Sequence, residues 1–255
     1  MRKEGLLARF GDELAQAWAI LVKDVRVYYF TPPMIMMGLL MPFFMFFSFS
    51  VRRGMAPQAG VAQLLAMTTF FTASSAGPVI IPLERRTRTY DRLLAAPMSL
   101  VTILAGKSLV GAFFGLAVSL VPLVAGLVLF RISIADPLLL LVSVILSAGV
   151  FSTLGILFAS GSAQSPGQVL MPSTLLRWPL LFISGIFIPL EQMAPWTRAI
   201  SYLSPLTYAQ DLLNHAVLGS GAQSPLLDLV VLPCLMALFL IPALKLHNRS
   251  RRLGY

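Results

Sequence analysis

Charged residues are scarce in this sequence. They make up 11% of the 255 residues, where a soluble domain carries about 25%, and hydrophobic residues make up 57% with a mean hydropathy of +0.83. This composition excludes an ordinary soluble protein and predicts an integral membrane protein. The net charge of +9 would suggest nucleic-acid binding in a soluble chain, but here its meaning depends on where the basic residues lie.

Residues that usually build disulfides and metal sites are also few. The one cysteine, Cys234, lies inside an apolar run and cannot form a disulfide within the chain. The two histidines, His215 and His247, fall on opposite predicted sides of the membrane. We therefore expect no metal site.

Motifs for nucleotide binding and hydrolysis are incomplete. Gly106-Lys107-Ser108 resembles the end of a phosphate-binding loop, but Val101 stands where that motif needs its first glycine. Neither a Gly-x-Ser-x-Gly elbow nor a Ser-x-x-Lys motif occurs. We expect no catalytic residue and no bound cofactor in this chain, and we interpret Lys107 as a headgroup anchor of a membrane span.

Six apolar stretches are long enough to cross a hydrocarbon layer of about 30 Å. They cover residues 34–51, 61–83, 102–130, 137–161, 169–190 and 225–244. Before them, apolar residues recur every three or four positions from Phe10 to Tyr29, which predicts an amphipathic helix at the membrane interface. The alternative for this helix is a soluble one packed on a partner. We expect an all-α integral membrane protein with residues 1–33 as N-terminal segment, 34–244 as six-span domain and 245–255 as basic tail.

Basic residues are distributed unequally between the two predicted sides. Fourteen of the nineteen Lys and Arg residues fall on the side of both termini, four fall on the other side, and Arg177 lies within the fifth apolar stretch. By the positive-inside rule, both termini are cytoplasmic. Arg177 is the one ionisable group that we expect inside a span, either as a pathway residue or as a side chain that reaches the headgroups.

Charged residues return between the second and third apolar stretches, at residues 83–99. A charge at the bilayer centre costs about 2.5 to 3.5 kcal/mol, so this segment must lie in water. Glu84 at its start, the pairing of Glu84 with Arg88 and the breaker Pro97 predict a short amphipathic helix. The alternative is a basic loop that merely follows the positive-inside rule.

The run from Glu84 to Pro97 resembles the segment between the second and third spans of ABC type-2 transporter permeases. Arg88 stands at the usual glycine position of that pattern, and Asp91 replaces a more common glutamate. The resemblance implies a coupling helix that docks on a separate ATP-hydrolysing subunit. We expect Tyr90 and Leu94 on its docking face, with Arg85, Arg86 and Arg92 against anionic headgroups. The residues it assigns to coupling are Glu84, Arg85, Arg86, Arg88, Tyr90, Asp91, Arg92 and Leu94.

A second resemblance covers residues 184–191, 195–196 and 204–208, which are similar to the end of the fifth span and the re-entrant region of the same family. The connection after residue 189 is too apolar for a solvated loop, and we expect short helices in the outer leaflet. The candidate pathway residues are Arg177, Ser184, Gly185, Pro189, Glu191, Pro205 and Tyr208.

Together these resemblances imply the permease subunit of an exporter in the cell membrane of a prokaryote. Its expected partners are two copies of an ATP-binding subunit, which would hold ATP and magnesium, a second permease copy or related permease, and membrane lipids, with no nucleic acid. The substrate could be a drug, a lipid or a polysaccharide precursor. The alternatives are an ion-coupled carrier, for which we find no internal repeat, and a membrane enzyme of lipid metabolism, for which clustered acidic residues and histidines are missing.

Overall fold

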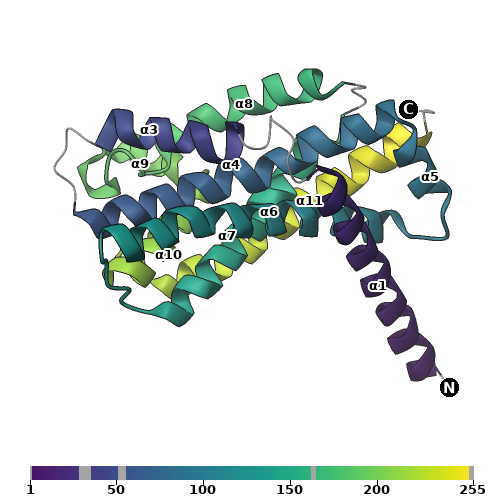
Figure 1. Cartoon of the computed structure of the whole chain (residues 1–255), viewed down its shortest axis with the longest axis horizontal. Helices are drawn as coiled ribbons and strands as arrows, with labels where there is room; N and C mark the ends of the chain where they lie inside the picture. The colour runs from purple at the N-terminus through teal and green to yellow at the C-terminus, as the bar shows by residue number, and fades with distance from the viewer. Residues whose placement is uncertain (1, 29–35, 51–55, 162–164, 253–255) are drawn as a thin grey trace.

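A computed structural model describes residues 2–28, 36–50, 56–161 and 165–252. The chain is 84% helical, and the described residues contain no strand. Its elements, most of them labelled in Figure 1, are α1 (Arg2–Tyr28), η1 (Met36–Leu40), α3 (Met41–Ser50), α4 (Pro57–Arg86), α5 (Thr89–Ala95), α6 (Leu100–Leu129), α7 (Pro137–Phe158), α8 (Pro166–Ile183), η3 (Leu190–Gln192), α9 (Pro195–Ser201), α10 (Pro205–Leu218) and α11 (Pro225–Arg252).

Helices occur at all six predicted apolar stretches, and four of them are long and apolar enough to cross a membrane. These four are α4, α6, α7 and α11. The apolar part of the first stretch, Gly38–Ser48, is shorter. The fifth, α8, has 18 residues and contains Arg177 together with Pro172 and Pro179 inside the helix.

Helix α4 forms the centre of the bundle. All residues of the most apolar 18-residue stretch of α4 are buried, whereas only 28% and 17% of the residues in the corresponding stretches of α6 and α11 are buried. Helix α4 packs on α6, α7, α8 and α10. Its middle is built of small residues, which let helices approach closely in a membrane: a Cβ atom added to Gly77 would lie 2.6 Å from the carbonyl oxygen of Gly155 in α7.

One end of the bundle, which we call the α5 end, contains α5 and the adjoining ends of α4, α6 and α11 (Figure 1). Here α4 continues to Arg86, and Glu84 lies in its last turn. Our prediction that Glu84 begins the short helix is therefore wrong, because α4 extends farther than its apolar run. Arg88 links α4 to α5 with a left-handed backbone, at φ 55°, and α5 ends as predicted just before Pro97, with Ala96 extended.

The opposite end, the α10 end, is made by η3, α9 and α10 between α8 and α11. This agrees with the short helices expected after the fifth apolar stretch. Gly185, at φ 89°, turns the chain after α8. Helix α10 packs on α4, α7 and α11, and Leu206, Leu212 and Leu213 are fully buried there.

Candidate functional site

A buried cluster of four charges joins three helices at the α5 end. The Lys107 ammonium lies 2.5 Å from Oε2 of Glu84 and 2.6 Å from Oδ2 of Asp24, and the Lys23 ammonium lies 2.5 Å from Oε1 of Glu84 and 2.8 Å from Oδ1 of Asp24. The side chains of Asp24 and Glu84 are 0% exposed, that of Lys107 is 1% exposed and that of Lys23 is 35% exposed. Two cations and two anions cancel, which is the condition under which buried charges are tolerated.

The charge cluster connects α1, which is remote in sequence, to the core helices α4 and α6. Ala17, Ile20 and Leu21 of α1 are buried on the same side, while Trp18 is exposed. Burial alone lowers the pKa of the Lys23 ammonium, but its hydrogen bonds to Asp24 and Glu84 outweigh burial and raise the pKa above its ordinary value. The Lys23 ammonium is therefore charged at neutral pH.

Two sequence-based interpretations of these residues are wrong. The Lys107 side chain does not extend to the protein surface, as an anchor would, but is 1% exposed inside the charge cluster. Glu84 pairs with Lys23 and Lys107 and not with Arg88. Sequence reasoning missed the cluster because its members come from three separate helices. The available signal was a Lys-Asp pair, Lys23-Asp24, next to the apolar face of an amphipathic helix.

The surface of α5 also differs from the predicted docking face. Tyr90 is 4% exposed and packs with Ile20, Ile103 and other residues of the chain's own core, and Leu94 lies half-buried against this core. The Arg85 guanidinium lies 5.4 Å from the centre of the Tyr90 ring and donates a hydrogen bond to the Gly161 carbonyl oxygen. Tyr90 is therefore covered by the chain's own core, and a docking role for the half-buried Leu94 stays a prediction. The coupling residues that remain exposed are Arg86, Arg88, Asp91 and Arg92.

Arg177 on α8 is fully buried against the middle of α4. Its Nη2 donates to the carbonyl oxygen of Ser74 at 2.6 Å, and its Nη1 donates to Oγ of Ser75 at 3.1 Å. Pro78 has no backbone N–H, so the Ser74 carbonyl four residues earlier has no helical partner. Arg177 therefore satisfies a carbonyl that Pro78 leaves free, and its guanidinium does not reach the headgroups.

A polar cavity of about 320 Å³ lies at the α10 end. Four predicted pathway residues, Ser184, Gly185, Pro189 and Glu191, line it together with residues that the sequence did not indicate. The most polar of these are Gln63, Thr207, Gln210, Asp211 and Asn214. The cavity thus joins the end of α8 to α4 and α10.

The other predicted pathway residues do not line this polar cavity. Arg177 lies at the middle of α4, Pro205 is buried at the start of α10, and the Tyr208 hydroxyl donates to the Tyr202 carbonyl oxygen at 2.9 Å. Arg177 is also not the one ionisable group within the predicted spans, because stretch 102–130 contains Lys107 and stretch 225–244 contains Asp228, and both residues are buried.

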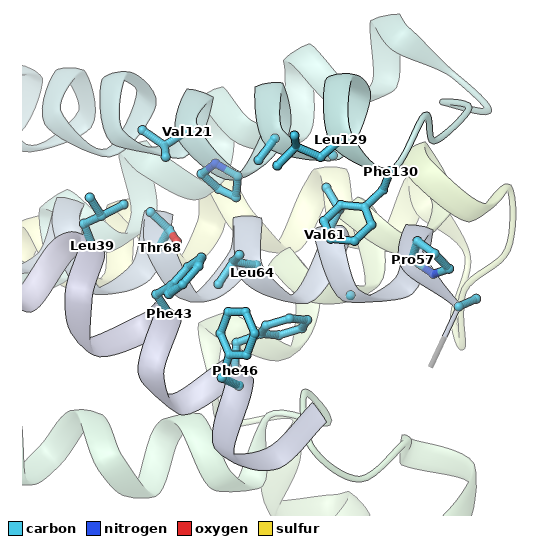
Figure 2. A pocket seen from close by; sticks show the side chains of 16 residues that line it. Leu39, Phe43, Phe46, Pro57, Val61, Leu64, Thr68, Val121, Leu129 and Phe130 are labelled. Atoms are coloured by element: carbon cyan, nitrogen blue, oxygen red, sulfur yellow. The ribbon is translucent and has the colours of Figure 1, made fainter. Parts of the chain in front are cut away.

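A second cavity, of about 450 Å³, is apolar and lies between α3, α4 and α6. Figure 2 shows Phe43 and Phe46 of α3 on one side of it and Val121 and Leu129 of α6 on the other. Val61 and Leu64 of α4 lie between them.

Comparison with known proteins agrees with the resemblance seen in residues 84–97. Nodulation protein J of Neorhizobium galegae is 27% identical over 199 residues, which cover 74% of each chain. Two Escherichia coli K12 proteins also match: the probable multidrug ABC transporter permease YbhR, 23% identical over 163 residues, and the inner membrane transport permease YadH, 25% identical over 166 residues. These alignments cover 64% and 65% of this chain but 44% of YbhR and 64% of YadH. The family model described as ABC-2 type transporter matches residues 15–218, so the chain belongs to the ABC-2 type transporter family.

Proposed function

We propose that this chain is the permease subunit of an ATP-driven exporter in a prokaryotic cell membrane. In this proposal the chain has six spans. Four are α4, α6, α7 and α11, the fifth is α8, and the sixth is formed by η1 together with α3. The α5 end and both termini are cytoplasmic by the positive-inside rule. The segment between α4 and α6 carries Arg85, Arg86, Arg88 and Arg92, and the tail after the last span is also basic. Two ATP-binding subunits carry ATP and magnesium, and two permease copies form the pathway.

The observation that most supports this proposal is the connection from the surface of α5 to the centre of the bundle. The turn at Arg88 joins α5 directly to α4, and Glu84 in the last turn of α4 is held by Lys107 of α6 and Lys23 of α1. If a bound partner displaces α5 through contacts with Arg88, Asp91 and Arg92, then α4, α6 and α1 would therefore move with it as one unit. This arrangement suits the transfer of a conformational change from an ATPase to the membrane domain.

Arg177 and the polar cavity are the pathway candidates within this proposal. Buried ionisable groups in membrane helices are costly and commonly mark substrate pathways. Arg177 holds α8 to α4, so α8 cannot move relative to α4 without breaking the two hydrogen bonds to Ser74 and Ser75. We assign to Arg177 a positioning role between these helices, and to the cavity lined by Glu191 and Gln210 a role at the outer mouth.

Co-purification tests the proposed function. The affinity-tagged chain, extracted from its own membrane in mild detergent, should bring down an ATP-binding protein, and the complex in lipid should hydrolyse ATP. The chain alone should neither bind nor hydrolyse ATP. A complex that lacks any ATP-binding protein, or saturable ATP binding by the isolated chain, would contradict the proposal.

A further inference from the structure

The apolar cavity between α3, α4 and α6 has a buried floor and an exposed rim. Val61 and Leu64 of α4 form the floor and are 6% and 9% exposed. Phe43 and Phe47 of α3, and Val121 of α6, line the cavity and are about half exposed. Figure 2 shows the α3 and α6 side chains on either side of the α4 floor. A ligand can therefore enter between α3 and α6 and reach α4.

Water is a poor occupant of this cavity. Among the described residues that line it, Thr68 has the one polar side-chain group and none is charged. An ordered water molecule needs two to four polar partners, and apolar cavities of this kind otherwise stay dry. An empty volume of about 450 Å³ would in turn deprive its aromatic and aliphatic walls of van der Waals contacts.

The position of the cavity beside two candidate membrane spans indicates which apolar ligand can reach it. Helices α4 and α6, which form two of its walls, are both candidate membrane spans, so hydrocarbon chains are the solvent at its rim. A helix of a second copy is about 10–12 Å across with its side chains, and a volume of this size would hold only about one turn of it. A single alkyl chain is much thinner and can follow the groove over the α4 floor.

We propose that this cavity binds one acyl chain of a membrane phospholipid, which inserts between α3 and α6 and lies on Val61 and Leu64. The phenylalanines of α3 and the aliphatic residues of α6 then enclose the chain on both sides. This inference depends on the membrane location of α4 and α6 and not on transport or on an ATPase, so it can fail while the proposed function holds.

Photolabelling in a bilayer tests the proposal. The purified chain is placed in nanodiscs that contain a phosphatidylcholine with a diazirine midway along one acyl chain. After illumination, the adducts are located by peptide mass spectrometry. Lipid that only coats the surface should label exposed residues such as Val124, whereas lipid in the cavity should also label Val61 or Leu64.

Two variants of α6 give a matched comparison. Ala125 lines the cavity, and Ala125→Phe should fill it and remove the adducts on Val61 and Leu64. Its neighbour Val124 is exposed and does not line the cavity, so Val124→Phe should leave those adducts in place. Ala125→Leu serves as a smaller replacement if Ala125→Phe does not fold, as judged by size-exclusion chromatography.

Three outcomes would overturn the proposal. The first is labelling of exposed residues with none on Val61 or Leu64 in the unchanged chain. The second is labelling of Val61 or Leu64 that persists in a folded Ala125→Phe variant. The third is a diazirine amino acid at position 64 that cross-links to a second copy of the chain and not to lipid.

Discussion

Oε2 of Glu84 and Nζ of Lys107 lie 2.5 Å apart inside the protein, and the two side chains are 0% and 1% exposed. Lys23 and Asp24 complete a cluster in which two positive and two negative charges cancel. Three of the four side chains are buried, so removal of one charge leaves a net charge that water reaches only through the partly exposed Lys23.

The Glu84→Gln substitution should therefore destabilise the chain strongly. Loss of one partner of a buried pair costs roughly 3–5 kcal/mol, because the remaining charge is uncompensated. Thermal unfolding of the purified chain in detergent measures the effect. Glu13→Gln makes the same chemical change at an exposed position of α1 and should leave the unfolding temperature unchanged.

A double variant separates charge balance from simple loss of contacts. Glu84→Gln with Lys107→Gln restores neutrality, since Lys23 and Asp24 still pair. The loss in free energy of unfolding in the double variant should be smaller than the sum of the two single losses by about 1 kcal/mol or more. Strictly additive losses would show that the four groups do not act as one cluster.

The hydrogen bond from Arg177 to the Ser74 carbonyl should contribute more to the free energy of unfolding when Pro78 is present than when it is replaced. Arg177→Met leaves that buried carbonyl without a donor, which costs about 1–3 kcal/mol. Alanine at position 78 supplies a backbone N–H that can bond the same oxygen, so Arg177→Met should cost about 1 kcal/mol less in the Pro78→Ala background.

Pro82→Ala is the control for this cycle. Pro82 also lies inside α4, but it frees the carbonyl of Pro78 and not that of Ser74. The cost of Arg177→Met should therefore be the same in the parent and in the Pro82→Ala background, measured by thermal unfolding in the same detergent. Equal relief by both alanines would contradict the assignment of the bond to a vacant carbonyl.

Replacement of Arg88 by glycine should stabilise the turn before α5. A left-handed backbone costs a non-glycine residue about 1–2 kcal/mol, and glycine loses part of this gain through its greater freedom when unfolded. We expect a net gain of about 0.5 kcal/mol in Arg88→Gly. Arg92→Gly, within helix α5, should instead destabilise by about 1 kcal/mol. Similar losses in both variants would argue against strain at Arg88.

Local patterns in the sequence predicted much of the fold. The apolar stretches placed the helices, because hydropathy over about 20 residues is a strong signal for membrane segments. Pro97 marked the end of α5, and the unusual residue of the family pattern, Arg88, fell at a position whose φ of 55° favours glycine. Each of these features depends on neighbours close in sequence.

Contacts between distant segments could not be read in the same way. Glu84 and Lys107 look like interfacial charges in the sequence, and their burial follows only from the packing of α1 on α6. Tyr90 lies in a charged segment, yet its ring is buried in the core cluster that contains Ile20 and Ile103, with its centre 6.4 Å from that of the His247 ring. The partner of Arg177 was hidden because it is a backbone carbonyl exposed by a proline in another helix.

Site-specific photocrosslinking tests most directly whether α5 docks a separate ATP-binding subunit. A benzophenone amino acid is placed at Arg92, which is exposed on α5, and separately at Val124 on the exposed face of α6. Illumination of the co-purified complex should join position 92, but not position 124, to the ATP-binding subunit. If position 92 gives no adduct in an intact complex while position 124 does, the docking surface lies elsewhere and the proposed coupling through Glu84 and Lys107 is wrong.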